Sequence, residues 1–363
     1  MSFLIAVSRI LAKFTALFVI GTAVLAYFVP QTCTFVKGTT QIIILGVIML
    51  SMGMTLGRQD YKILAQRPFD IFVGAVAQFT IMPLLAIFIA QTFNLSDGLT
   101  LGLVLVGCCP GGVSSNIMSF LCKGDVAFSV GMTTVSTLIA PVATPLLVNL
   151  LIGQRIDIDP WIMFQFMLLV TIIPVAIGSS CNIMFHKYEF FKQVRQVMPG
   201  VAVIGFALIV GGVIAVHGDK FLQSGLIIFA CIFCHNAFGY VLGYVAAKFF
   251  GMSTAKKRTL SIEVGVQNAG LATGLCGKFF PTSAEAAIAS AVSCVWHSIS
   301  GTILANIFLW FDKKTEENNN SVENLKKSTN GFKALCPKQG ALFFFKIIFS
   351  FLCTDSKHSS PHV

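Results

Sequence analysis

Residues 107–116 read GCCPGGVSSN and interrupt an apolar run that is otherwise long enough for a membrane-spanning helix. Pro110 lacks a backbone donor and clashes with the preceding helical turn. Two glycines and then three consecutive polar side chains follow this proline. One interpretation is a proline kink whose serines bond back to the i−4 carbonyls. The Gly-Gly pair favours real unwinding of the helix instead.

A second polar stretch, residues 261–270, reads SIEVGVQNAG and places Glu263, Gln267 and Asn268 deep in another apolar run. A carboxylate at this depth is costly and persists only beside donors or a cation. No Lys or Arg lies at a matching depth of the sequence, so a metal cation is the natural partner. The oxygen-rich neighbours predict a hard ion such as sodium, to which unwound carbonyls add ligands. A protonated Glu263 bonded to a neighbouring helix is the alternative.

The composition explains why these two stretches are conspicuous. The 363 residues are 55% hydrophobic and 11% charged and include 34 Phe, whereas soluble domains have about 25% charged residues. These values exclude a soluble globular chain and a disordered one, and they leave a polytopic membrane protein. The formal net charge is +10, but the basic residues gather in short clusters between apolar runs. That distribution argues against a nucleic-acid partner.

Apolar runs of about 20 residues, the length that crosses a bilayer, predict an all-α fold of ten spans. With the N-terminus in the cytoplasm, 21 of the 25 Lys and Arg residues lie inside and 4 outside. This bias follows the positive-inside rule and places both termini in the cytoplasm. The predicted spans are 14–30, 40–57, 69–92, 98–121, 126–150, 160–185, 198–217, 224–249, 258–280 and 284–311.

Ten spans divide into two halves of five, and the odd number gives the halves opposite orientation in the membrane. Both unusual stretches fall in the fourth span of their half, which is typical of inverted-repeat transporters with broken helices. The first run could pass for a signal peptide, but its length favours a retained span. Residues 1–13 are expected to be a cytoplasmic N-terminus. Residues 312–363, which include Glu316, Glu317 and three consecutive Asn, are expected to be a disordered tail.

Other polar residues in neighbouring spans could complete a binding site. Ser129 and Thr133 are four residues apart and therefore share one helix face, and Gln78 lies well inside an apolar run. Hydroxyl rows in membrane helices more often serve packing and interhelical bonds than ligand binding. These residues are therefore candidate ligands only because Asn116 and Glu263 are expected nearby.

At these residues the chain resembles the bile acid:sodium symporter family in its short ten-span bacterial form, over roughly residues 14–311. The shared motifs are residues 107–112, Ser115-Asn116, Ser129 with Thr133, 263–268, Gly124-Asp125 and Trp296-His297. The resemblance implies a core domain of spans 3–5 and 8–10 and a panel domain of spans 1, 2, 6 and 7. The two broken helices would cross in the core.

The resemblance also implies a substrate and two transported sodium ions. The organic anion would bind between core and panel, near Val113, Ser114, Asn268 and His297. The family usually has Thr where this chain has Val113, and relatives resemble carriers of bile acids, pantoate or small keto acids, so the substrate stays open. The first sodium site would consist of Ser115, Asn116, Ser129, Thr133 and Glu263, and the second of Gln78, Glu263, Gln267 and the carbonyls of Val264 and Val266.

Other functions fit less well. Residues 231–235 read CIFCH, a c-type haem pattern, but they lie inside an apolar run. A serine hydrolase built on Ser114 with His235 or His297 would lack the glycine that follows the serine in a nucleophile turn. A passive channel would need rings of repeated charges.

A proton-coupled anion transporter or exchanger with the same crossed-helix plan is the nearest alternative. Such proteins typically need an acidic pair, and Glu263 stands alone in its run. We therefore expect a transporter rather than an enzyme, embedded in a lipid bilayer. The short N-terminus has no transit peptide, which favours a bacterial inner membrane.

Overall fold

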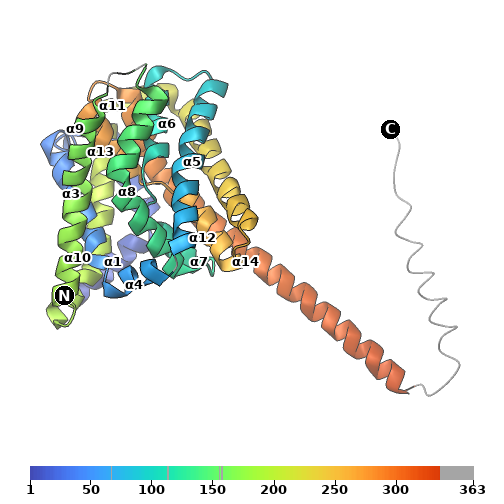
Figure 1. Ribbon diagram of the computed structural model, residues 1–363. Coiled ribbons are helices and arrows are strands. Elements are labelled where there is room, and N and C mark those ends of the chain that lie inside the picture. The colour runs from blue at the N-terminus through green and yellow to red at the C-terminus, as the bar shows by residue number, and fades with distance from the viewer. Residues whose placement is uncertain (67, 113, 155, 157, 336–363) are drawn as a thin grey trace, which may run out of the picture. The chain divides into compact units, whose positions relative to one another are not determined.

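The computed structural model describes residues 1–335 apart from 67, 113, 155 and 157 (Figure 1). Most of the described residues are helical, and the described part of the chain has one isolated β-bridge. They belong to two compact units, of which the first is Met1–Phe308 and the second begins at Leu309. In chain order the helices are α1 (Ser2–Lys13), α2 (Thr15–Phe28), α3 (Thr39–Thr55), α4 (Arg58–Gln66), α5 (Pro68–Thr92), α6 (Asp97–Cys108), α7 (Ser114–Leu121), α8 (Val126–Ile152), α9 (Pro160–Met167), α10 (Ile173–Phe185), α11 (Glu189–Phe249), α12 (Thr254–Gly265), α13 (Ala269–Phe279) and α14 (Ala284–Leu335).

Six helical segments of the described chain are long and apolar enough to cross a membrane, judged by length and composition. α1 and α2 together pass the same test but are bent by 85°, and α3 and α6 are shorter apolar helices. The all-helical fold agrees with the class predicted from the composition. The six segments are Pro68–Thr92, Val126–Ile152, Pro160–Phe185, Glu189–Phe221, Leu226–Phe249 and Ala284–Thr315.

Two places in the chain differ from straight helices joined by turns. A π-helical turn, Leu168–Ile172, joins α9 to α10 within one long apolar segment. α11 runs through two predicted spans, which non-helical backbone at His217 (φ −124°, ψ 16°) separates. The turn expected between 217 and 224 is therefore reduced to a kink.

The outer surface of the long helices is apolar. Phe72 and Leu84 of α5 are 65% and 57% exposed, and Leu146 and Leu150 of α8 are 58% and 77% exposed. Apolar area on this scale is unusual on a soluble monomer and is what lipid tails would cover.

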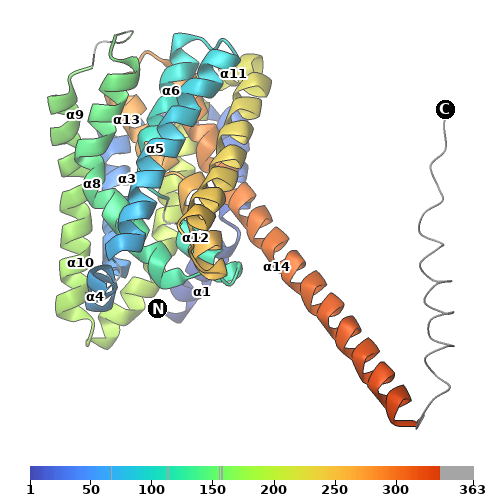
Figure 2. The same cartoon turned by 45° about the vertical axis from the view of Figure 1, so that its right-hand side comes forward.

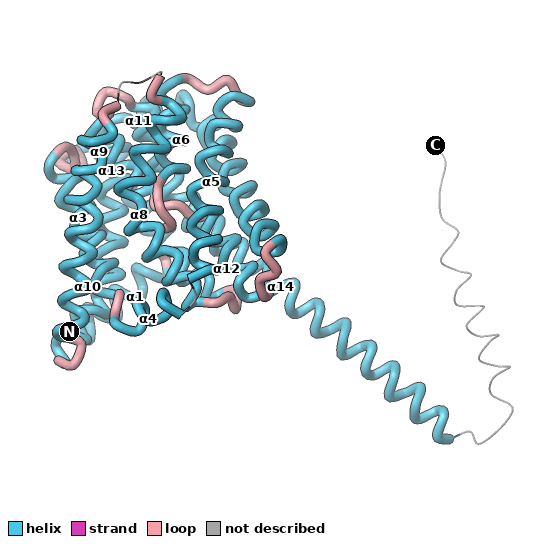
Figure 3. Tube along the Cα trace, viewed as in Figure 1, coloured by secondary structure: helices cyan, strands magenta, loops and turns pink. Residues whose placement is uncertain are grey.

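The two helices predicted to be broken are both interrupted. α6 ends at Cys108 and α7 begins at Ser114, while α12 ends at Gly265 and α13 begins at Ala269. Figure 3 shows loop segments at mid-height among the helices, where α6 gives way to α7. α6 and α12 each have 12 residues, and each follows a serine N-cap, Ser96 or Ser253.

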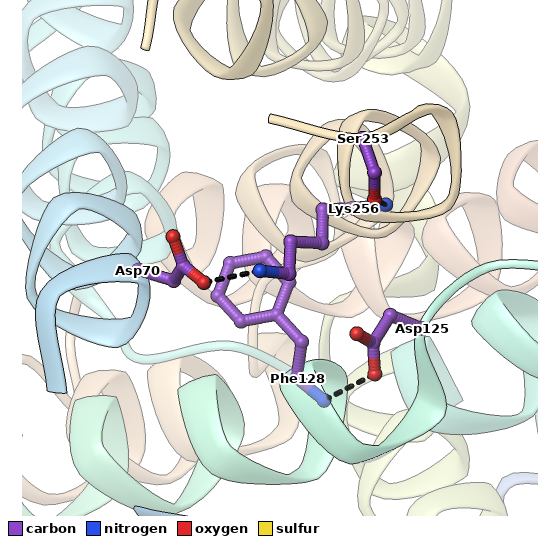
Figure 4. Close-up of polar contacts among 5 residues, drawn as sticks. All are labelled: Asp70, Asp125, Phe128, Ser253 and Lys256. Carbon is purple, nitrogen blue, oxygen red and sulfur yellow. Dashed lines mark hydrogen bonds and ion pairs between the residues drawn. The ribbon is translucent and has the colours of Figure 1, made fainter. Parts of the chain in front are cut away.

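Polar contacts join three helices at one end of the first unit. Lys256, in the first turn of α12, forms an ion pair with Asp70 of α5 (Figure 4). Asp125 accepts from the backbone N–H of Phe128 at 3.0 Å and caps α8. The N–H of Asp125 in turn donates to Thr259 Oγ1 of α12 at 2.9 Å. These contacts connect α5, α8 and α12 at one end of the bundle.

Two terminal segments have more structure than the sequence suggests. The first 13 residues form α1, where the Ser8 hydroxyl donates to the carbonyls of Gln196 and Val197 at 3.1 Å. In the second unit α14 continues to Leu335, so residues 312–335 are helical where the sequence predicts disorder. Its Glu and Lys residues are good helix formers, which outweighs their low hydrophobicity. Residues 336–363 of the predicted tail lie outside the described residues.

Candidate functional site

The two helix breaks cross and are joined by main-chain hydrogen bonds. The N–H of Gly112 donates to the carbonyl of Val266 at 2.8 Å, and the N–H of Asn268 donates to the carbonyl of Pro110 at 2.8 Å. These bonds flank the antiparallel bridge between Gly111 and Gln267. They satisfy backbone groups that interrupted helices leave without an intrahelical partner.

The glycines of the first break allow this close approach. A Cβ on Gly111 would lie 3.0 Å from Glu263 Oε2, and a Cβ on Gly112 would lie 2.9 Å from the carbonyl oxygen of Gln267. Both distances are shorter than ordinary van der Waals contact. Packing at the crossing therefore explains the Gly-Gly pair.

Two buried side chains support the helix ends that point at the crossing. The Thr144 hydroxyl donates to the carbonyl of Cys108 at 2.7 Å, and Asn236 Nδ2 donates to the carbonyl of Gly265 at 2.8 Å. Each one satisfies the last carbonyl of a broken helix. The sequence pattern identifies neither residue as part of the site, although each is a polar residue inside an apolar run.

Glu263 of α12 is fully buried and surrounded by hydroxyl groups. Ser115 Oγ donates to its Oε1 at 2.6 Å, Thr133 Oγ1 donates to its Oε2 at 3.0 Å, and Ser129 Oγ also contacts Oε1. Ser129 Oγ lies 2.8 Å from Asn116 Oδ1. Among the described residues no Lys, Arg or His side chain bonds to the carboxylate. The structure therefore brings together all five residues predicted for the first sodium site.

The residues predicted for a second ion also lie close to the crossing. The side-chain amides of Gln78 and Gln267 are 2.7 Å apart, and Gln267 Nε2 donates to the carbonyl of Val264 at 2.8 Å. In the orientation that satisfies both ends of its amide, Gln78 donates to the main-chain carbonyl of Glu263 at 2.9 Å. Gln78, Gln267 and the carbonyls of residues 263 and 264 thus converge.

One residue predicted for the second ion is placed differently. The carbonyl of Val266 accepts from Gly112 and so takes part in the crossing itself. Val113 lies outside the described residues.

A cavity of about 120 Å³ lies beside the crossing. One wall comes from α1, α2 and the first part of α11, including Thr15 and Phe206. The opposite wall comes from the broken helices and α14. It includes three residues that the sequence predicts for the anion, Ser114, Asn268 and His297.

Two buried groups of this cavity have no hydrogen-bond partner among the described residues. They are Asn268 Nδ2 and His297 Nε2, and their residues are 3% and 2% exposed. Asn268 Oδ1 accepts from the N–H of Leu271 at 3.0 Å and caps α13. His297 Nδ1 lies 3.3 Å from the amide nitrogen and 3.2 Å from the carbonyl oxygen of Gln267. The tautomer decides between these two bonds: Nε2 carries the ring proton when Nδ1 accepts from the amide, and accepts when Nδ1 donates to the carbonyl. Asn268 Nδ2 is a donor in either case, and it lies beside the N-terminus of α13, an arrangement that suits a carboxylate.

The residues of the haem pattern belong to a helix. Cys231, Cys234 and His235 lie within α11, and His235 Nε2 is 3.0 Å from the carbonyl of Met82. In the described part of the chain no cluster of three or more His, Cys, Asp and Glu side chains is positioned to hold a metal ion.

Comparison with known proteins identifies the family. The profile of the sodium bile acid symporter family matches residues 42–224. An uncharacterized sodium-dependent transporter of Bacillus subtilis is 39% identical over 311 residues, which are 86% of this chain and 94% of that protein. A probable chloroplastic sodium/metabolite cotransporter of Arabidopsis thaliana is 38% identical over 280 residues, or 77% and 69% of the two chains. The ileal sodium/bile acid cotransporter of Oryctolagus cuniculus is 32% identical over 249 residues, or 66% and 69%. The chain belongs to the sodium bile acid symporter family.

Proposed function

We propose that the protein is a sodium-coupled symporter of an organic anion in the cell membrane. Family membership supports sodium-dependent transport. The observation that carries the proposal is Glu263, a fully buried carboxylate whose bonded side chains among the described residues are three hydroxyls. In its ionised form such a group needs a positive charge in its surroundings, and a sodium ion among oxygen atoms would supply it.

The first ion would bind among Ser115, Asn116, Ser129, Thr133 and Glu263. Their hydroxyl and amide oxygens retain lone pairs beyond the bonds already made, so a small rotation would direct several of them at one cation.

The second ion would bind beside the crossing, among the amide and carbonyl oxygens of Gln78, Gln267, Glu263 and Val264. The carbonyl of Val266, which accepts from Gly112, has a second lone pair for the ion. Two sodium ions with one monovalent anion would make transport electrogenic. The membrane potential then contributes about 2.3 kcal/mol per net charge per 100 mV.

The anion would bind in the cavity beside the crossing. Its carboxylate would accept from Asn268 Nδ2, and from His297 in the tautomer that carries its proton on Nε2, with Ser114 in the same cavity wall. A cavity of about 120 Å³ suits a small carboxylate, such as pantoate or a keto acid, or the charged end of a bile-acid-like molecule.

We further propose ten membrane crossings with both termini in the cytoplasm. The six long segments, the bent pair α1–α2, α3 and the two broken helices make up this number. The cavity wall from α1, α2 and α11 would belong to the panel, and the wall from α7, α13 and α14 to the core. Movement of core against panel would then expose the anion to each side in turn. Proteins related to this chain are described as transporters, in line with a function in transport rather than catalysis.

The proposal is tested by uptake of radiolabelled organic anions into proteoliposomes that contain the purified protein. Uptake is expected under an inward sodium gradient and should rise when a negative interior potential is imposed. Equal uptake of an identified substrate from potassium medium would contradict sodium coupling. Uptake that instead follows a proton gradient would favour the proton-coupled alternative.

A further inference from the structure

A second cavity, of about 370 Å³, lies where several apolar helices end. The last residues of α3 and α10 and the first residues of α4 and α11 form its walls, and it shares no residue with the cavity at the crossing. α4 lies at the same end of the bundle as α1 (Figures 1 and 2). Since the apolar helices α3 and α10 stop here, this level corresponds to the boundary between hydrocarbon and headgroups.

Two arginines share this cavity without a carboxylate partner. Among the described residues Arg58 has no hydrogen bond or ion pair from its guanidinium, and Arg195 has only a 3.4 Å contact from Nη1 to Asn182 Oδ1. The one acid of the cavity, Asp60, accepts from the N–H of Gly57 at 2.7 Å. Two like charges at one cavity repel each other, and a bound anion would remove that repulsion.

The floor of the cavity is polar and fixed. Asn182 is only 2% exposed. Beside it, Ser179 Oγ donates to the carbonyl of Leu56 at 3.2 Å and lies 2.9 Å from the hydroxyl of Tyr61. The first turn of α4 adds backbone N–H groups and the positive end of the helix dipole.

We propose that this cavity binds the phosphodiester group of an anionic membrane lipid. The guanidinium groups of Arg58 and Arg195 would each form paired bonds to phosphate oxygens. The two Arg and one Asp of the cavity leave a single positive charge, which matches one phosphodiester. The acyl chains would continue along the apolar face of α10, where Ile177 and Met184 are 52% and 67% exposed. Such a lipid would hold α3, α10 and α11 together at this end.

The test is a titration of the purified full-length protein, followed by native mass spectrometry. The probes are short-chain phosphatidylglycerol, phosphatidylcholine of the same chain length and free glycerol phosphate. The cavity variant is Arg58→Gln with Arg195→Gln. The matched control is Lys248→Gln with Lys257→Gln, which removes two positive charges from the end of α11 and the start of α12. Loss of the two forked contacts should weaken phosphatidylglycerol binding about tenfold in the cavity variant and leave the control unchanged.

Three results would decide against the lipid. Equal phosphatidylglycerol binding by parent, cavity variant and control would overturn the site. Glycerol phosphate that binds as tightly as the lipid would assign the cavity to a soluble phosphate instead. If the double glutamine variant fails to fold, Arg58→Lys with Arg195→Lys keeps both charges and should still bind about threefold more weakly than the parent. Unchanged affinity in that variant would also overturn the proposal.

Discussion

The backbone nitrogen of Gly112 donates to the carbonyl oxygen of Val266 at 2.8 Å, so the two broken helices are joined directly through their main chains. Gln267, the next residue, extends its side chain toward Gln78 and Val264, while its amide nitrogen lies 3.3 Å from His297 Nδ1. One residue therefore contacts both the proposed ion ligands and a wall of the anion cavity. Occupancy of either proposed site would act on the same short segment, which is the physical basis expected for coupling.

Thr133→Val tests the hydroxyl shell of Glu263. Valine keeps the shape of the side chain but loses the oxygen 3.0 Å from Glu263 Oε2. A bond to a charged group contributes about 1.5–3 kcal/mol, so the sodium concentration for half-maximal uptake should rise at least about tenfold. The matched control is Thr134→Val, since Thr134 is equally buried and bonds the carbonyl of Val130 in its own helix. Equal effects from the two substitutions would count against Thr133 as a ligand.

Gly111→Ala tests the packing of the crossing. The new methyl group would lie 3.0 Å from Glu263 Oε2. Relief of this close contact requires either the Glu263 carboxylate or the segment around Gly111 to move. We expect loss of uptake and a stability loss of about 1–3 kcal/mol, measured by chemical unfolding in detergent. Gly46→Ala is the control, because a Cβ there meets no atom within 4 Å. Full activity of Gly111→Ala would show that transport does not depend on this close packing of the two broken helices.

Asn268→Ser separates the cap of α13 from the donor in the cavity. Serine is also a good N-cap, but it lacks the amide nitrogen that faces the cavity without a partner. The KM for the transported anion should rise about tenfold, with little change in the half-saturating sodium concentration. Asn306→Ser, at an exposed position where Nδ2 bonds the carbonyl of Thr302 at 2.9 Å, should change neither. If Asn268→Ser raised the KM for the anion and the half-saturating sodium concentration by the same factor, a role specific to the anion would be contradicted.

The ion pair between Asp70 and Lys256 is expected to stabilise the contact between α5 and α12 rather than to take part in transport. Both side chains are 23% exposed, so the pair should contribute about 1 kcal/mol. Asp70→Asn and Lys256→Gln should each lower the unfolding free energy by that amount. The exchanged variant, Asp70→Lys with Lys256→Asp, should recover part of it. A double-mutant cycle without coupling energy, or a changed sodium dependence of uptake, would refute this assignment.

The helices were predictable where the bilayer fixes their length. The predicted span 69–92 corresponds to α5, Pro68–Thr92, and 126–150 to α8, Val126–Ile152. Long-range contacts were not predictable in the same way. α1 is held to the bundle by the hydroxyl of Ser8 and the carbonyls of residues 196 and 197, which are nearly 190 positions away in the chain. No local pattern reports such a contact.

The residues of the candidate site also divide into those that were predictable from the sequence and those that were not. Glu263 was predictable because a lone acid in an apolar run has few explanations. Thr144 and Asn236 were not, because a polar residue that caps a broken helix has the same sequence pattern as one that bonds its own helix. The pairing of Gly111 with Gln267 was also not readable, since it depends on two segments that approach only in the folded bundle.

Calorimetric titration of sodium chloride into the purified protein, with potassium chloride as the reference, examines the ion site without knowledge of the substrate. The parent protein should bind two sodium ions per chain. Glu263→Gln should bind neither, because the carboxylate that it removes is the proposed ligand shared by both ions. Glu189→Gln, which removes an exposed acid paired with Lys192, should bind both. Sodium binding by Glu263→Gln with the stoichiometry and affinity of the parent would contradict the assignment of Glu263 as the shared sodium ligand.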